Sequence, residues 1–373
     1  MLHTPTSDEG DLDTPIPPVF FAEQALLGAL LLDPRRLDEV PGIAPEAFST
    51  AVHSAVFAAI RSLPAPDPAQ HAQNTAWLDE VLTSARKQAH GLNASYLHTL
   101  IQVCPRPRHA PAYTRMIEAE HARRTLRAGA QRLAQAAGDL THPQPVPTAL
   151  AAADALTDVV DHLAATFPSG PASLPRTPAA PPAPAPAHDE DEAAEEERSL
   201  LATATASPAV IDQMRWLTAD DFVNPLNGGL WQAATALARR RAAVDPVTVL
   251  WESQHRGLLA SGAQPAEVLR ALAAPAAGDP HYWGEQILHR SLLTTARHVA
   301  RHIEALTDDP ATTPQQLLLG SRRALASLNA VRARWHQANS PAPTPPPHAS
   351  KAPVRPRAGP PRTTAPGPSR ASR

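Results

Sequence analysis

Large side chains recur in this chain at a constant spacing of 174 residues, and this repeat restricts the possible folds more than any other feature. Without a gap, the matched pairs are Glu23 with Glu197, Leu26 with Leu200, Leu27 with Leu201, Pro34 with Pro208, Leu37 with Ile211, Asp38 with Asp212, Phe48 with Phe222, Phe57 with Trp231 and Leu63 with Leu237. At a spacing of 170, Tyr113 matches Trp283, Ile117 matches Ile287, Arg127 matches Arg297, Ala130 matches Ala300 and Leu133 matches Ile303. Ala- and Leu-rich helices can match by chance, but matched prolines and aromatics favour a repeated core.

Apolar residues in both halves follow helical spacing, and alternating strand patterns are essentially absent. Two stripes of the first half are Leu26, Leu27, Leu30 and Leu31, and then Val52, Ala55, Val56, Ala59, Ile60 and Leu63. Phe48 follows a short helix start at Pro45 and is expected to fill a gap between helices, so that its truncation costs about 3 to 5 kcal/mol. We predict an all-α protein in which each half is a small helical globule followed by a two-helix hairpin. The second hairpin helices are expected at 147–165 and 314–334.

Proline-rich stretches divide the chain. There are 43 prolines among 373 residues, with 8 between Pro168 and Ala187 and 11 between Ser340 and Arg373. Such stretches bury too little apolar surface to fold and act as extended spacers. The predicted parts are a disordered acidic head at 1–19, a helical domain at 20–166, a Pro-rich and acidic linker at 167–194, a second helical domain at 195–337 and a disordered basic tail at 338–373.

The run from Ala22 to Pro34, AEQALLGALLLDP, resembles the first helix of the N-terminal domain of DnaB-type replicative DNA helicases. Further similar segments are Phe48 with His53, Phe57-Ala58-Ala59-Ile60, Tyr96-Leu97-His98-Thr99-Leu100, Tyr113-Thr114-Arg115-Met116-Ile117 and, in the second half, Val244-Asp245-Pro246-Val247-Thr248-Val249-Leu250. The first half has 64–73 in place of that last segment, which leaves the corresponding helix in question. In the second half, Arg198 replaces Gln24, and Val268-Leu269 replaces the tyrosine-leucine pair. The order and spacing of these segments carry the resemblance.

The resemblance implies tandem helical domains of a kind that pairs into a collar above a helicase ring and provides a docking surface for primase and loaders. The motor of such helicases needs Gly-x-x-x-x-Gly-Lys-Ser/Thr, in which backbone N–H groups and one lysine hold the nucleotide phosphates. Neither lysine fits this motif, because Gln88 follows Lys87 and Ala352 follows Lys351. We therefore expect no ATPase domain, no enzymatic activity and no cofactor.

Clusters of arginine on the predicted hairpins are either a partner surface or solvated helix faces, and the candidate residues are Arg123, Arg124, Arg127, Arg297, Arg301, Arg322 and Arg323. His298 and His302 have a spacing that can hold a metal ion, with Glu304 or His289 as a third ligand, although a solvated face is the preferred interpretation. Carboxylates such as Glu118 and Asp158 are explained by helix amphipathicity without acid-base chemistry. We expect no catalytic, cofactor-binding or metal-binding residues.

The predicted function is a non-catalytic protein-protein interaction module of DNA replication. The expected partners are a replicative helicase or primase, or self-association of the two repeats. The alternative is a nucleic-acid-binding accessory factor, because the tail has six basic residues and no carboxylate, and such contacts weaken steeply with salt. The lone Cys104 and the lack of a signal-like N-terminus favour a cytoplasmic protein, with no membrane contact.

Overall fold

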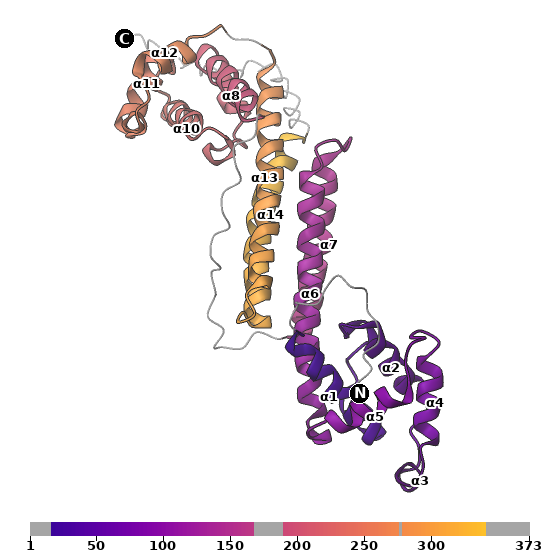
Figure 1. Cartoon of the computed structure of the whole chain (residues 1–373). Helices are drawn as coiled ribbons and strands as arrows, with labels where there is room; N and C mark the ends of the chain where they lie inside the picture. The colour runs from indigo at the N-terminus through magenta and orange to yellow at the C-terminus, as the bar shows by residue number, and fades with distance from the viewer. Residues whose placement is uncertain (1–15, 168–188, 276–277, 341–373) are drawn as a thin grey trace, which may run out of the picture. The chain divides into compact units, whose positions relative to one another are not determined.

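The computed structural model describes residues 16–167, 189–275 and 278–340. Within these ranges the chain is all-α and contains no strand (Figure 1). The predicted all-α fold class is confirmed. No described helix is both long enough and apolar enough to cross a membrane. The acidic head and the basic tail predicted from composition fall almost entirely outside the described residues.

The first repeat is a globule followed by a helical hairpin. The globule contains α1 (Pro18–Leu32), η1 (Pro34–Glu39), η2 (Pro45–Ala47), α2 (Ala51–Ser62), α3 (Pro68–Gln73), α4 (Ala76–Ala85), α5 (Ala94–Val103) and η3 (Pro107–His109). The hairpin contains α6 (Ala110–Gly138) and α7 (Pro145–Thr166). Polar side chains cap the N-termini of several of these helices. The Thr50 side chain accepts a hydrogen bond from the amide of His53, and the Asn93 side chain accepts one from the amide of Tyr96. These bonds satisfy amides that have no partner within the helix.

The second repeat has the same order of main helices, but it has no counterpart of α3 or η3 and has an additional short helix, η5. Its globule contains α8 (Asp189–Ala206), α9 (Ala209–Gln213), η4 (Ala219–Asp221), α10 (Pro225–Arg239), α11 (Pro246–His255), η5 (Leu258–Ser261) and α12 (Pro265–Leu272). Its hairpin contains α13 (Pro280–Asp308) and α14 (Pro314–Ala338). Asn224 and Asp245 cap α10 and α11, and proline occupies the first turn of both helices, where it removes no helical hydrogen bond.

The repeated sequence positions form equivalent cores. α1 packs against α2, α5 and α6, and α8 packs against α10, α12 and α13. The paired aromatics are buried, since Phe48 is 5% exposed and Phe222 is 8% exposed, while Phe57 and Trp231 are almost fully enclosed. The predicted burial of Phe48 is therefore confirmed, and the spacing of 174 residues reflects one core built twice.

Two sequence-based expectations differ from the structure. The linker predicted at 167–194 overlaps α8, which begins at Asp189 because Ala193, Ala194 and Glu197 lie on its buried face. Carboxylates at its first turn also favour a helix start. The helix left in question after Pro64 is present, because α3 and α4 occupy that region and α4 packs on α2 as α11 packs on α10.

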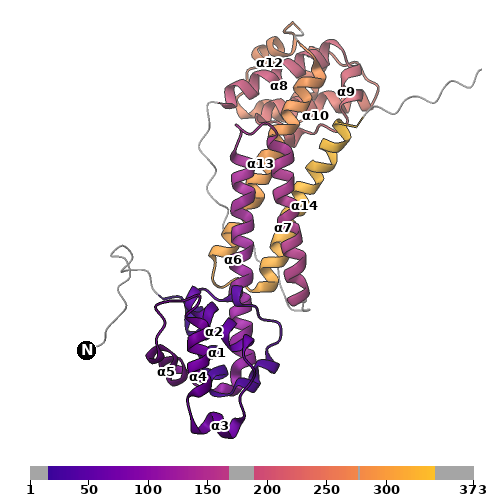
Figure 2. The ribbon, with the colours of Figure 1, turned by 90° about the vertical axis from the view of Figure 1, so that its right-hand side faces the viewer.

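The two hairpins pack side by side and antiparallel (Figure 2). α6 contacts α13, and α7 contacts α14. Apolar residues of all four helices belong to one cluster, including Leu126, Leu156, Leu306 and Leu325. The antiparallel direction is evident from Arg123, near the start of the hairpin part of α6, which reaches Thr307 at the end of α13.

Gly28 allows α1 to lie very close to α5. A Cβ added there would be 2.0 Å from the carbonyl oxygen of Leu100 and 2.9 Å from the Cβ of Cys104. We expect Gly28→Ala to lower the free energy of unfolding by about 1 to 3 kcal/mol, because backbone must move. Gly138→Ala is the control, since a Cβ there meets no atom within 4 Å. Urea denaturation measures both, and equal stability of the two variants would contradict the prediction.

Candidate interaction surfaces

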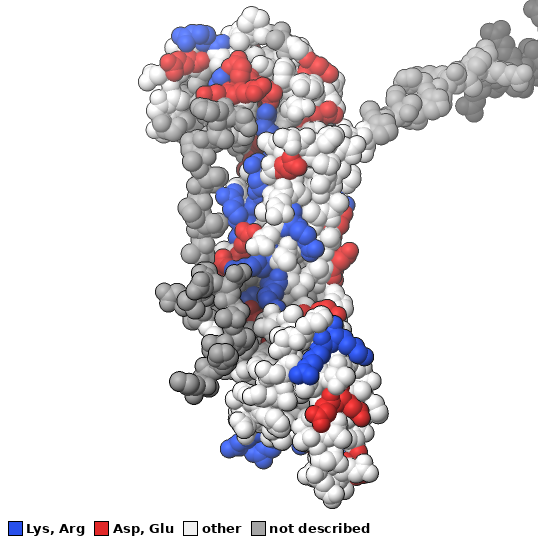
Figure 3. Space-filling view, turned by 45° about the vertical axis from the view of Figure 1, so that its right-hand side comes forward, with Lys and Arg blue, Asp and Glu red and all other residues white. Residues whose placement is uncertain are grey.

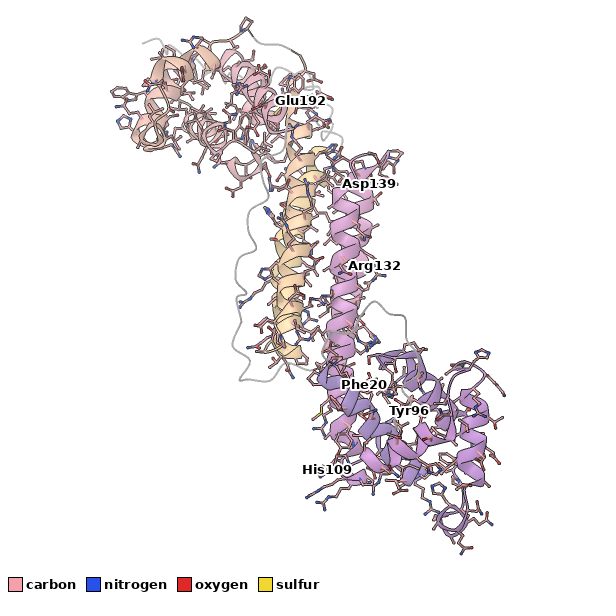
Figure 4. The ribbon with its side chains drawn as sticks, viewed as in Figure 1. Phe20, Tyr96, His109, Arg132, Asp139 and Glu192 are labelled. Atoms are coloured by element: carbon pink, nitrogen blue, oxygen red, sulfur yellow. The ribbon has the colours of Figure 1, made fainter. Side chains whose placement is uncertain are left out.

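A buried carboxylate organises each globule. In the first, Glu23 is 0% exposed and accepts hydrogen bonds from the Ser49 amide at 2.6 Å and the Ser49 hydroxyl at 3.0 Å. His53 Nδ1 lies 2.6 Å from the same carboxylate, and His53 Nε2 lies 2.7 Å from the Tyr96 hydroxyl. The ring of Phe20 also packs against His53, with 4.8 Å between the ring centroids. Figure 4 labels both Tyr96 and Phe20. Glu23 thereby holds the loop before α2 against α1.

This Glu-His-Tyr arrangement resembles a proton relay in its connectivity, but its surroundings favour a structural role. Glu23 and His53 are both fully buried, so neither is open to a substrate. Burial is the main cause that raises the pKa of Tyr96, whose hydroxyl lies 2.7 Å from His53 Nε2. The network therefore positions α1, α2 and α5 relative to one another.

The second globule also contains a buried, hydrogen-bonded glutamate, but its hydrogen-bond partners differ from those of Glu23. Glu197, at the position equivalent to Glu23, accepts from the amides of Val223 at 2.5 Å and Asn224 at 3.2 Å. Asn227, equivalent to His53, donates its side-chain amide to Glu197 at 2.9 Å. Burial raises the pKa of Glu197, although these hydrogen bonds oppose the shift. The matched glutamates were visible in the sequence, but their burial was not.

Arg123 joins the two hairpins. Its guanidinium donates to the carbonyl oxygens of Thr307, Asp309 and Thr312 at 2.8, 2.8 and 2.7 Å. These carbonyls lie at the C-terminal end of α13 and in the turn after it, where helical donors are missing. Arg123 therefore caps a helix of the other repeat.

Arg123→Ala is expected to lower the free energy of unfolding by about 1.5 to 3 kcal/mol, because hydrogen bonds from a charged donor are lost and carbonyl groups are left unpaired. Arg215→Ala serves as the control, since the Arg215 side chain is 74% exposed and pairs with Asp212 one turn away. Thermal or chemical unfolding measures both variants. If Arg123→Ala is as stable as Arg215→Ala, the capping role is wrong.

Three more of the candidate arginines make contacts within the described chain. Arg124 donates to the carbonyl oxygens of Ala47 and Phe48 and so fixes the loop before α2. Arg127 pairs with Asp308, and Arg322 pairs with Asp161 at 2.9 Å. Both of these ion pairs cross between the hairpins.

Arg297, Arg301 and Arg323 are the candidates for which no carboxylate partner is present among the described residues. Arg297 and Arg301 are half-buried on α13 and donate to groups of their own helix, such as the Leu293 and Arg297 carbonyls. Arg323 is exposed on α14. Basic side chains are visible over the hairpin helices in Figure 3, and Figure 4 labels Arg132 on α6.

The candidate acidic residues and histidines lie in partly buried surroundings that shift several of their pKa values. Glu118 and Asp158 line a cavity of about 390 Å³ together with His121 and His162, and burial raises the pKa of Glu118 and lowers that of His121. Burial is also the main cause that lowers the pKa values of His298 and His302. Among the residues with described positions, no three His, Cys, Asp or Glu side chains are placed to hold a metal ion.

An exposed apolar ridge on α11 was not predicted. Val247 and Trp251 are both 63% exposed and lie one helical turn apart. In the equivalent helix α4, the buried Val81 corresponds to Val249, which places the polar Asp79 and Thr83 at the two ridge positions. The fold therefore does not require apolar residues there, and an exposed tryptophan is typical of a contact surface. A comparison of the sequences of α4 and α11 could have indicated this apolar ridge, because polar residues stand at the equivalent positions of α4.

The described elements define this protein as an all-α protein in which one helical domain, a globule followed by a hairpin, occurs twice in tandem. The family model described as DnaB-like helicase N terminal domain matches residues 17–119 and again 189–282, which together exceed half of the chain. The chain therefore belongs to the family of DnaB-like helicase N-terminal domains and carries two tandem copies of the domain. No curated protein matches the chain, and no solved structure does so either.

Proposed function

We propose that this protein is a non-catalytic interaction module of DNA replication, in which two DnaB N-terminal-like domains pair within one chain and dock a replicative helicase or primase. The main support is the tandem family match together with the packed hairpins. The family is one of oligomerisation and partner-binding domains. Joining two such domains in one chain raises their effective concentration and favours internal pairing.

The test is a pull-down of the full chain with the helicase and the primase of the same host. Micromolar or tighter binding to one of them is expected, and binding to neither would contradict the proposal. Arg297→Ala/Arg301→Ala removes two arginines on α13 that have no carboxylate partner within the described part of the chain. Trp251→Ala removes the centre of the ridge on α11. Arg215→Ala is the matched exposed control, and loss of binding in one variant identifies the docking surface.

The same preparation tests the absence of catalysis. We expect no ATP hydrolysis above background with or without single-stranded DNA, because neither lysine lies in a phosphate-binding loop. Turnover that persists through purification and increases with protein concentration would contradict a non-catalytic role. A helicase from the same host provides the positive control.

A further inference from the structure

The second helices of the two hairpins carry opposite charges. α7 contains the aspartates Asp154, Asp158 and Asp161 and has no lysine or arginine. α14 contains the arginines Arg322, Arg323, Arg332 and Arg334 and has no aspartate or glutamate. The two helices occupy equivalent places in the repeated fold, so the fold itself does not demand this difference.

These opposite charges meet where the helices pack. Arg322 Nη2 lies 2.9 Å from Asp161 Oδ1, and Arg332 Nη2 lies 3.0 Å from Asp154 Oδ2. Arg332 makes a second contact to the same carboxylate, which gives a two-point pair. The α7 and α14 contact is therefore complementary in charge as well as apolar.

The first helices of the hairpins are also unlike at their contact. Arg127 of α6 pairs with Asp308 of α13. At the repeat spacing of 170 residues, the equivalents of these two residues are Arg297 and Gly138, so the mirrored contact has no carboxylate. Likewise Leu293 stands where Arg123 does. A pair of two identical hairpins could not reproduce both sets of contacts.

We infer that this charge difference selects the pairing of the first repeat with the second over the pairing of either repeat with its own copy. Pairing of a repeat with its own copy would place α7 against a second α7, where all the carboxylates and arginines are aspartates, or α14 against a second α14, where they are all arginines. Exposed ion pairs contribute little individually, but specificity depends on the difference between the favoured and disfavoured pairings, to which repulsion adds. The first hairpin fits a hairpin with a basic second helix. This inference rests on the internal pairing in the proposed function and not on docking of a helicase or primase.

Charge reversal in the full chain tests the selection. Asp154→Arg/Asp161→Arg places arginine on both sides of the two ion-pair contacts, and Arg322→Asp/Arg332→Asp places aspartate on both sides. Each double variant is expected to lower the melting temperature by about 3 to 6 °C, and the quadruple variant to recover most of that loss. Asp154→Asn/Asp161→Asn, which removes attraction without adding repulsion, should have a smaller effect. The inference would be overturned if the quadruple variant lost as much stability as the two double variants lose together.

A mixing experiment tests selectivity between chains. The two double variants are unfolded and refolded together, and masses are measured by light scattering, with circular dichroism confirming their helix content. The mixture is expected to form an assembly of two chains, because the arginines at the contact positions of one variant meet the aspartates at the contact positions of the other. Wild-type chains treated in the same way should stay single. A mixture that contains only single chains would overturn the inference, and neither result depends on helicase or primase binding.

Discussion

Replacement of His53 by alanine is expected to lower the free energy of unfolding by about 3 to 5 kcal/mol, because it removes one partner of a fully buried pair. The Glu23 carboxylate would keep its bonds from Ser49 but lose the imidazole 2.6 Å away. The Tyr96 hydroxyl would lose its partner as well. Urea denaturation followed by circular dichroism measures the change.

The second repeat supplies the matched control. Asn227 stands at the position of His53 and donates to Glu197, so His53→Asn should retain a donor to Glu23 and cost less than His53→Ala. The equivalent substitution in the second globule, Asn227→Ala, removes the donor to Glu197. If His53→Asn and His53→Ala are equally unstable, the histidine is not acting mainly as a hydrogen-bond donor to the carboxylate.

Replacement of Trp231 by alanine should also lower the free energy of unfolding by about 3 to 5 kcal/mol, because the side chain is 1% exposed and its removal leaves a cavity in the second core. Its ring lies beside that of Phe222, and its Nε1 donates to the carbonyl oxygen of Leu217 at 3.2 Å. The variant therefore loses both packing and one hydrogen bond.

Trp231→Phe separates these two effects. Phe57 occupies the equivalent position of the first repeat and is fully buried, so phenylalanine is compatible with this core. We expect Trp231→Phe to cost about 1 to 3 kcal/mol, because a smaller ring remains and the Leu217 carbonyl loses its donor. Denaturation curves of both variants provide the measurement. A phenylalanine variant as unstable as the alanine variant would show that the hydrogen bond, rather than the ring volume, dominates.

Much of the fold could be predicted from local patterns. Apolar residues at helical spacing and prolines at helix starts indicated α1, α2 and both long hairpin helices, and the matched aromatics indicated two similar cores. The start of α8 was misjudged because an acidic run is typical of an exposed linker by composition. Only the packing of Ala193 and Ala194 shows that this run begins a helix.

The candidate arginines show where local patterns stop. Arg123 and Arg124 are neighbours on α6, yet one caps a helix of the other repeat and the other holds a loop of its own globule. The partners of Arg123 lie 184 to 189 residues away in the chain. No helical periodicity encodes which of two adjacent side chains faces which distant backbone.

The sequence by itself determined that this protein is built from helices and that one helical unit occurs twice, because periodic apolar side chains favour helices and matched large residues require similar cores. Tertiary structure alone decided that Glu23 and His53 lie buried in contact and that α7 faces α14. The physical reason is that burial and charge pairing depend on contacts between residues far apart along the chain. Those contacts form only when packed helices bring the residues within a few ångströms.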